Sequence, residues 1–569
     1  MFLGEALIRI IGFIINKRGI KEMRKIGTIL VVGLLLIGFA FAGGMVTNTN
    51  QSADFIRLMN RNASTDVDAV YFNPAGLTHL NDGLHFYVSS QTIYQGRTIK
   101  SDVPMLNSDT FEGYTFAPVF PNFYFAYKKD KLAIGAGFVA IGGGGSAVFD
   151  DGLPSFEAPV ALIPAGLTAS GIPTSKYDLD VAFEGSSVYM GGQAIVSYKV
   201  NDMISVAGGA RYFAATNAYT GHIRDIMINP TYTDAGYTGN MVSAPEFFTT
   251  MAAAFAGLGA QAVAGAASAQ AGADGLQPLI AGGAGDLTFE TLLGLGMLDQ
   301  ATVDGIAGGM AALGQSFDSA TDTPSSAETK FLGAAAYLTG AAAEAQAGSA
   351  GMAANAAATG DVEVDAEQTG SGFAPVVGLY LTPMDGVAIS LRYEGKAAMT
   401  LTNDTKVDGS GLFQDGVETG ADMPAVVSVG LAVRATPSLQ VVADMNYYLT
   451  SGVDWDGLED HLKDGLEAGV GFDFALNESL QLSAGFLRTF NSGALPRYHT
   501  DLSHAFTSST IGAGGKYAIN KNLYLSFGVS NTFYDDLDNV GVDYRGMWTG
   551  NEIYDKTSID FAIGIGYSR

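Results

Sequence analysis

The chain has 569 residues, of which 47% are hydrophobic and only 15% are charged, with 74 glycines, 11% aromatic residues and a net charge of −27. A soluble domain usually has about 25% charged residues and a disordered chain is short of aromatic residues, so this composition favours a large folded β-protein. The acidic balance argues against a nucleic-acid partner, and the absence of cysteine excludes disulfides, a cysteine-ligated metal and a cysteine nucleophile.

Residues 1–42 are predicted to be an N-terminal extension followed by a secretory signal peptide. Arg24 and Lys25 supply a positive n-region, residues 26–39 are apolar, and an Ala-Phe-Ala cleavage site precedes Gly43. We therefore expect an exported protein whose mature chain begins at Gly43. An uncleaved helical anchor is the alternative, and the signal itself leaves open whether the first 22 residues are translated.

The next segment, 43–80, combines a short predicted helix with a proline turn. Apolar residues at helical spacing within 52–62 indicate the helix. In the turn that follows, proline fixes φ, asparagine can bond its own backbone, and glycine permits a tight exit. An ordinary turn is the alternative interpretation. The turn motif consists of Asn73, Pro74, Ala75 and Gly76.

Beyond this turn, apolar and polar residues alternate with period two in fourteen segments, the pattern of strands with one apolar face. In the first segment, for example, Leu84, Phe86 and Val88 alternate with His85 and Tyr87. The predicted strands are 82–98, 123–127, 132–138, 188–198, 203–219, 373–381, 387–401, 424–433, 439–449, 465–474, 480–490, 506–519, 523–533 and 558–567.

Short turns and long loops alternate between these strands. In outer-membrane barrels the short turns face the periplasm and the long loops face outside. An even number of antiparallel strands closes without an edge, as a bilayer requires, because lipid cannot satisfy exposed backbone groups. The sequence therefore predicts an all-β fold, a fourteen-stranded antiparallel transmembrane β-barrel over residues 81–569.

Residues 68–77, which read Asp-Ala-Val-Tyr-Phe-Asn-Pro-Ala-Gly-Leu, together with the fourteen strands give a family resemblance. The chain resembles the FadL-type outer-membrane transporters, the family of long-chain fatty acid and aromatic hydrocarbon channels. The resemblance is specific at 68–77 and generic in the strands. It implies an N-terminal hatch, residues 43–80, that plugs the lumen of a barrel in a Gram-negative-type outer membrane. Hydrophobic small molecules, outer-membrane lipids and the barrel assembly machinery are the implied partners.

An Ala- and Gly-rich insert, residues 221–370, interrupts the strand pattern. A helical apolar stripe near its start and apolar runs at 292–298 and 331–343 predict helices. The alternative is that these helices only pack on each other. The family resemblance implies an extracellular loop insert whose helices form the first hydrophobic groove for the substrate. The groove candidates are Phe247, Met251, Phe255 and Leu258.

A run of four glycines lies at the far end of the third predicted strand. Glycines have no side chain to pack and weaken a strand. The resemblance implies a kink in the third strand that opens the wall and lets an apolar substrate leave sideways. A flexible start to the second long loop is the alternative. The predicted kink consists of Gly142, Gly143, Gly144 and Gly145.

Alternation also predicts which charged side chains face the lumen. Arg211, Arg392 and Lys396 are candidates to bind a carboxylate head group, because charge-assisted hydrogen bonds are strong in a restricted lumen. The alternative is that they pair with lumen acids and stiffen the barrel. The charged side chains predicted to face inward are Arg211, Arg392, Glu394, Lys396, Asp444 and Lys516.

The sequence favours transport over catalysis. The six histidines show no metal-site spacing and no Gly-x-Ser-x-Gly elbow occurs, so we predict no enzyme, no metal and no cofactor. A barrel enzyme, such as a phospholipase or a protease, stays an alternative. The favoured function is passive uptake of hydrophobic molecules. Its rivals are a general diffusion porin for small polar solutes and a structural or adhesin barrel whose insert is the functional part.

Overall fold

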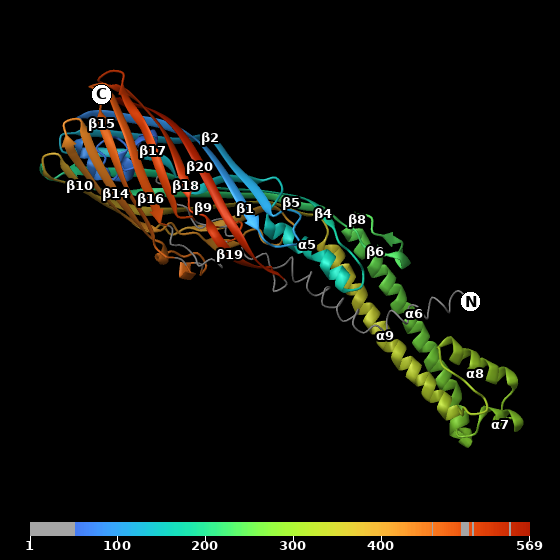
Figure 1. Cartoon of the computed structure of the whole chain (residues 1–569). Coiled ribbons are helices and arrows are strands. Elements are labelled where there is room, and N and C mark those ends of the chain that lie inside the picture. The colour runs from blue at the N-terminus through green and yellow to red at the C-terminus, as the bar shows by residue number, and fades with distance from the viewer. Residues whose placement is uncertain are drawn as a thin grey trace. The chain divides into compact units, whose positions relative to one another are not determined.

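The structure, a computed structural model, describes residues 52–569 except 458, 462, 491–499, 503, 505 and 545–547 (Figure 1). The predicted signal peptide and mature N-terminus lie outside these residues. The chain divides into two compact units, a barrel unit and a helical unit. Among the described residues, the barrel unit comprises 52–158, 180–224 and 361–569, and the helical unit comprises 159–179 and 225–360.

Fourteen antiparallel strands form a closed barrel. They are β1 (Gly83–Ser101), β2 (Thr110–Lys129), β3 (Leu132–Phe149), β4 (Tyr177–Lys199), β5 (Ile204–Ile228), β9 (Val362–Met384), β10 (Val387–Glu394), β13 (Ala425–Thr436), β14 (Leu439–Leu449), β15 (Gly465–Ala475), β16 (Leu480–Phe490), β17 (Ser508–Ala518), β18 (Leu523–Tyr534) and β20 (Trp548–Ser568). Strand β1 pairs with both β2 and the last strand, β20, so the sheet is closed. The fourteen predicted strands are confirmed. Shorter strands β11 (Thr400–Asp408), β12 (Glu418–Gly420) and β19 (Leu537–Tyr544) extend this sheet.

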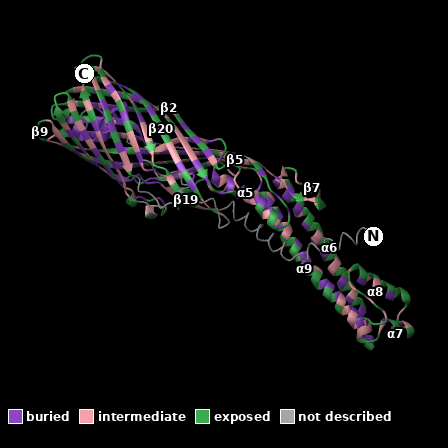
Figure 2. Ribbon diagram, in the orientation of Figure 1, coloured by how far each residue is buried: buried purple, intermediate pink, exposed green. Residues whose placement is uncertain are grey.

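Buried and exposed residues alternate along the strands, as the banded colouring of Figure 2 shows. In β10, Leu391 and Tyr393 are exposed on the outside, whereas Ser390 and Arg392 are buried inside. The predicted faces of this strand are therefore confirmed. An outer face of exposed apolar and aromatic side chains is what contact with lipid requires, which makes this a transmembrane barrel.

Residues 52–80 lie inside the barrel. They form helix α3 (Ala53–Leu58), helix α4 (Ala69–Phe72) and a 3₁₀ helix, η1 (Pro74–His79). The predicted first helix is confirmed and ends where Met59 adopts a left-handed conformation, with φ 63°. We call residues 52–80 the hatch.

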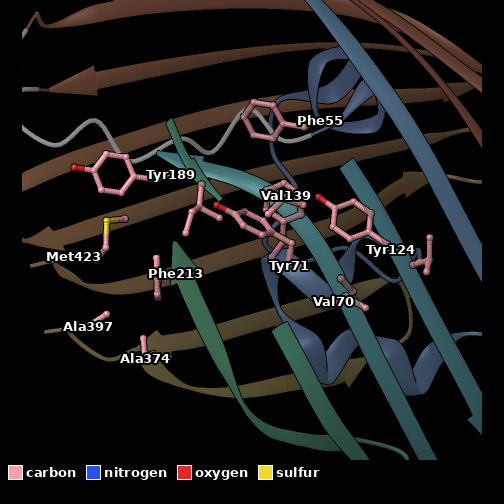
Figure 3. Packing of buried hydrophobic residues seen from close by; sticks show 14 of the residues in the cluster. Phe55, Val70, Tyr71, Tyr124, Val139, Tyr189, Phe213, Ala374, Ala397 and Met423 are labelled. Carbon is pink, nitrogen blue, oxygen red and sulfur yellow. The ribbon is translucent and has the colours of Figure 1, made fainter. Parts of the chain in front are cut away.

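The hatch packs into a cluster of inward-facing barrel side chains. Hatch residues Phe55 and Tyr71 belong to the same buried cluster as Tyr124 of β2, Val139 of β3 and Phe213 of β5 (Figure 3). The hydrophobic core of the barrel is therefore built between the hatch and the wall. Burying a large apolar side chain contributes about 1.5–3 kcal/mol, so this cluster holds the hatch firmly.

The helical unit contains the long insert. Its main helices are α6 (Ala244–Leu279), α7 (Phe289–Gly294), α8 (Gln300–Ala312) and α9 (Pro324–Ala358), with short strands β6 (Thr231–Tyr232), β7 (Tyr237–Thr238) and β8 (Val242–Ser243). The predicted helices are present, and α9 is longer than expected because its surface is alanine-rich rather than amphipathic. Ala-rich sequence forms helix without an apolar stripe, so periodicity alone underestimates its length.

One sequence expectation about connections was wrong. The insert was expected to lack strands over 221–370, but β5 continues to Ile228 and β9 begins at Val362. Beyond the apolar band the outward face of a strand is no longer hydrophobic, so the period-two signal disappears while the pairing continues. The loop after β3 contains helix α5 (Pro154–Ala169), in which Pro159 and Pro164 obscured the helical pattern.

Candidate functional site

The turn motif of the hatch is bonded to the barrel wall. Asn73 Oδ1 accepts a hydrogen bond from the Ala75 N–H at 3.1 Å, which is the local bond that the sequence predicts. Its Nδ2 donates to the carbonyl oxygens of Leu379 at 3.0 Å and Leu391 at 3.3 Å, on β9 and β10. A Cβ at Gly378 would lie 2.5 Å from Asn73 Oδ1, so glycine is needed there for this close approach. The motif thus anchors the hatch as well as turning it.

Other parts of the hatch reach other strands. Lys516 Nζ of β17 lies 3.0 Å from the Asp66 carboxylate. The Asn62 N–H donates to Asp444 Oδ2 of β14 at 2.7 Å. The inward placement predicted for Lys516 and Asp444 is confirmed. Because these bonds come from several parts of the wall, they hold the hatch across the lumen.

The barrel wall is interrupted between β2 and β3. The β2–β3 hydrogen-bond ladder starts at the turn between these two strands and continues to the pair Phe123–Phe138. The next pair along the ladder is Tyr114–Val148. Residues 115–122 of β2 therefore have no partner on β3. Two of these residues are prolines, which cannot donate to a ladder. We call this interruption the wall break.

The predicted glycine kink lies on the β3 side of the wall break. Gly143 has φ 89° and Gly145 has φ 73°, in the region that favours glycine. A Cβ at Gly143 would overlap the carbonyl oxygen of Ser187 on β4. The register between β3 and β4 also shifts on both sides of Gly142. The strand is therefore irregular at the predicted place, and its role as an exit stays a prediction.

An apolar cavity of about 180 Å³ lies in the barrel unit against this kink. Gly143, Gly144 and Gly145 form one part of its lining, and aromatic rings from β3, β4, β5 and the loops form most of the rest. Such a lining suits an apolar ligand, because binding pockets are mainly hydrophobic with a few placed polar groups. The aromatic lining residues are Phe149, Phe156, Phe183, Tyr189, Tyr219, Phe413 and Phe506.

Two basic side chains, Arg97 of β1 and Lys556 of β20, also line this cavity. They are direct partners across the β1–β20 ladder. Arg97 Nε is buried and donates no hydrogen bond to any described residue. In the described part of the chain, no acid lies within 4.0 Å of either cation. The acid in the lining is Asp501, whose pKa is raised by burial although it accepts the Ser155 N–H at 2.8 Å. The cavity thus presents positive charge without a paired counter-charge.

The three basic residues selected from the sequence are engaged with protein groups. Arg211 Nη1 lies 3.0 Å from the Glu394 carboxylate, and Arg392 Nη1 donates to the Tyr71 carbonyl oxygen at 2.7 Å. Lys396 Nζ lies 2.6 Å from Asp422. Their contacts therefore agree with the alternative in which these basic residues bond to groups of the protein itself. Their role in binding a head group stays a prediction.

The groove candidates of the insert lie within the helical unit. Phe247, Met251 and Phe255 are buried, and Leu258 is half-buried. Phe247 packs against Tyr237, with ring centroids 4.9 Å apart. These side chains hold α6 to its neighbours, and their role in a substrate groove stays a prediction.

Arg97 and Lys556 were missed although a signal for them exists. The outward position of Leu84 and Val88 puts odd-numbered residues of β1 inside, which includes Arg97. The outward position of Ile559 puts even-numbered residues of β20 inside, which includes Lys556. The predicted last strand began at residue 558, after the apolar pattern stops, so Lys556 was not considered.

Comparison with family models and with curated proteins finds no match. Among solved structures, the crystal structure of a Pseudomonas aeruginosa FadL homologue matches with a TM-score of 0.53 and 11% identity, covering 92% of this chain and 99% of that chain. The Pseudomonas putida toluene transporter TodX matches with a TM-score of 0.48 and 11% identity, covering 91% of this chain and 97% of that chain. The likeness to the FadL homologue establishes that this chain has the FadL-type barrel fold.

Proposed function

We propose that the protein belongs to the FadL-type transporters and takes up hydrophobic molecules passively across a Gram-negative outer membrane. One observation carries the proposal: an apolar cavity lies against the glycine kink of β3 at the wall break, in a barrel whose lumen holds a bonded hatch. A diffusion porin instead requires an open polar lumen. The apolar lining and the filled lumen therefore favour hydrophobic cargo over small polar solutes.

The proposed route follows from these features. Long outer loops and the helical insert capture the molecule, and it enters the apolar cavity. The hatch blocks the direct path along the barrel axis, because it is hydrogen-bonded to several strands. The unpaired stretch of β2 offers the other path, sideways through the wall into the membrane. Opening there breaks no ladder hydrogen bonds, since none exist between β2 and β3 at that point.

The cavity also favours one kind of hydrophobic molecule, an amphiphile with an anionic head group. Arg97 and Lys556 supply two cations without a paired acid beside an aromatic lining. A carboxylate placed between them gains charge-assisted hydrogen bonds, while its hydrocarbon chain contacts the rings. A long-chain carboxylate therefore satisfies both parts of the cavity, whereas a neutral hydrocarbon satisfies only the apolar part.

Vesicle assays test this function against the porin alternative. The purified barrel is reconstituted in phosphatidylcholine vesicles, and uptake of radiolabelled palmitate is compared with osmotic swelling in small sugars. We expect palmitate uptake above that of empty vesicles and swelling no faster than that of empty vesicles. Rapid swelling in sugars without palmitate uptake would identify a porin and reject the proposal.

A further inference from the structure

The outer face of the barrel carries a notch beside the wall break. In one row of paired residues, Tyr114 of β2 is followed by Gly96 of β1, Thr557 of β20 and Phe533 of β18. Both rings are more than half exposed, at 51% and 54%. A Cβ built on Gly96 would meet only Thr557 Oγ1, at 3.1 Å. Two small residues thus separate two aromatic rings, and we call this gap the outer notch.

Strand geometry gives the width of the outer notch. Neighbouring strands lie about 4.8 Å apart, so the two ring-bearing strands are separated by roughly 14 Å. The next row of the same face contributes Phe116, Tyr94 and Ile559, and the Tyr94 and Phe116 rings are stacked with centroids 4.8 Å apart. A groove of about 640 Å³ is lined by the residues of both rows. The notch therefore has apolar sides and room for a hydrocarbon chain.

The polar edge of the notch limits what it accepts. On the side away from Tyr94, the next paired row contains Glu112 and Asp555 on either side of Thr98. Two acids at this edge repel an anionic head group, while the aromatic sides favour apolar chains. The surroundings thus suit the chain of an anionic amphiphile and not its head.

The notch is continuous with the wall break. Phe116 lies within the stretch of β2 that has no partner on β3, and its ring forms a side of the groove. A chain that emerges at the free edge of β2 needs to cross a single strand to reach Gly96. Lys556, which lines the inner cavity, neighbours Thr557 on β20 and lines the groove as well.

We infer that the outer notch is an external seat for the hydrocarbon chain of the transported molecule after it leaves through the wall break. This inference rests on the proposed function. In the outer notch, the hydrocarbon chain of the transported molecule contacts the outer wall after it leaves the inner cavity and before it enters the bilayer. A bilayer lipid chain is the competing occupant, and the experiment separates the two.

The test fills the notch from outside. Gly96→Phe places a ring in the notch, and Thr557→Phe fills it from β20 if the first variant fails to fold. Gly208→Phe is the matched control, because Gly208 is exposed on β5 and a Cβ there has no atom within 4 Å. Each variant is assayed for palmitate binding in detergent, palmitate uptake into phosphatidylcholine vesicles, and labelling by palmitate with a diazirine at its chain end.

We expect equal palmitate binding in all variants, because the inner cavity is untouched. Uptake should fall about tenfold in the notch-filled variants alone, the factor that two buried methylene groups supply. Diazirine labelling of wild type should map to residues 94–96 and 557–559 and disappear in the filled variants. If wild type takes up palmitate and the filled variants match the control, the notch holds bilayer lipid only and the inference is overturned. If wild type neither binds nor takes up palmitate, the proposed function fails as well.

Discussion

Within the described residues, Arg97 and Lys556 have no acid within 4.0 Å, which separates them from three other cations of the barrel. Arg211, Arg392 and Lys396 each contact a carboxylate or a carbonyl oxygen. A partly buried cation without a paired acid gains no ion-pair stabilisation of the fold, and Lys556 Nζ instead lies 5.0 Å from the centroid of the Tyr534 ring. Two cations without a paired acid in an apolar cavity are therefore better explained by a ligand than by stability.

Replacing the unpaired cations should separate anionic from neutral ligands. In Arg97→Met and Lys556→Met, binding of palmitate should weaken by about 10-fold or more each, because one charge-assisted hydrogen bond contributes about 1.5–3 kcal/mol. Binding of hexadecane should stay unchanged, since the apolar lining is kept. Equilibrium binding in detergent with both ligands measures the difference.

Lys100→Met is the control for this experiment. Lys100 is exposed on the same strand as Arg97, and its replacement removes one positive charge outside the cavity. Palmitate binding should be unaffected by it. Equal loss of palmitate binding in Lys100→Met and Arg97→Met would show that net charge matters and not the cavity, and would reject the head-group assignment.

At the scale of the element, the glycines of β3 allow this strand to bend. The positive φ of Gly143 and Gly145 bends the strand where the ladder to β2 is absent. On the opposite side of the wall break, two prolines remove two N–H donors from β2. Both strands therefore contribute to the irregular wall, and the sequence pointed only to the glycines.

Valine at the kink should change transport more than folding. In Gly143→Val with Gly144→Val, the first side chain cannot keep φ 89°, and the second points to Arg97, since a Cβ at Gly144 lies 3.6 Å from Arg97 Nη2. Left-handed strain costs about 1–2 kcal/mol, and the overlap of the new Cβ with the Ser187 carbonyl oxygen forces a local shift between β3 and β4. Both effects are confined to the kink, so the rest of the closed sheet keeps its pairing. We expect normal heat-modifiable migration in gels and reduced palmitate uptake.

The matched control is Gly192→Val on β4, opposite Phe138 of β3, where a Cβ has open space. It adds the same side chain to the same region of the wall without touching the kink. Uptake by this variant should equal that of wild type. If the doubly substituted kink variant folds and transports like the control, lateral exit at β3 is wrong.

At the scale of the whole molecule, the hatch and the barrel form one hydrogen-bonded body. The hatch has ion pairs and hydrogen bonds to inward-facing side chains around the lumen, such as Arg392, Asp444 and Lys516. Each bond contributes only about 1 kcal/mol, or somewhat more where a charge takes part. The closed sheet, by contrast, satisfies its own backbone, so the barrel does not depend on the hatch to stay closed.

Removing the hatch should therefore open the barrel without unfolding it. In a variant lacking residues 43–80, the polar lumen groups become solvated, and we expect a large rise in ion conductance and in swelling of vesicles by small sugars. Asn73→Ala with Pro74→Ala should give a smaller rise, because it removes the turn and the bonds to Leu379 and Leu391 only. Planar-bilayer recordings measure both. Unchanged conductance after the deletion would mean that this segment does not occupy the lumen.

The sequence by itself determined the fourteen strands, their faces and the local turn at Asn73. These features depend on period two and on the backbone preferences of asparagine, proline and glycine, which are local properties of the chain. The alternation that placed Arg211 and Arg392 inside also places Arg97 inside. The side of the wall on which a side chain lies was therefore predictable even for residues that were overlooked.

Only the tertiary structure decided which inward cations are paired and where the wall is interrupted. Glu394 lies on β10 and pairs with Arg211 of β5. The two residues are far apart in the sequence, and no sequence pattern predicts that they pair. The wall break depends on the register between β2 and β3. The sequence of either strand alone does not determine this register. Facing is a local property of one strand, whereas pairing and register are properties of two, and for that reason the cavity emerged only when the strands were brought together.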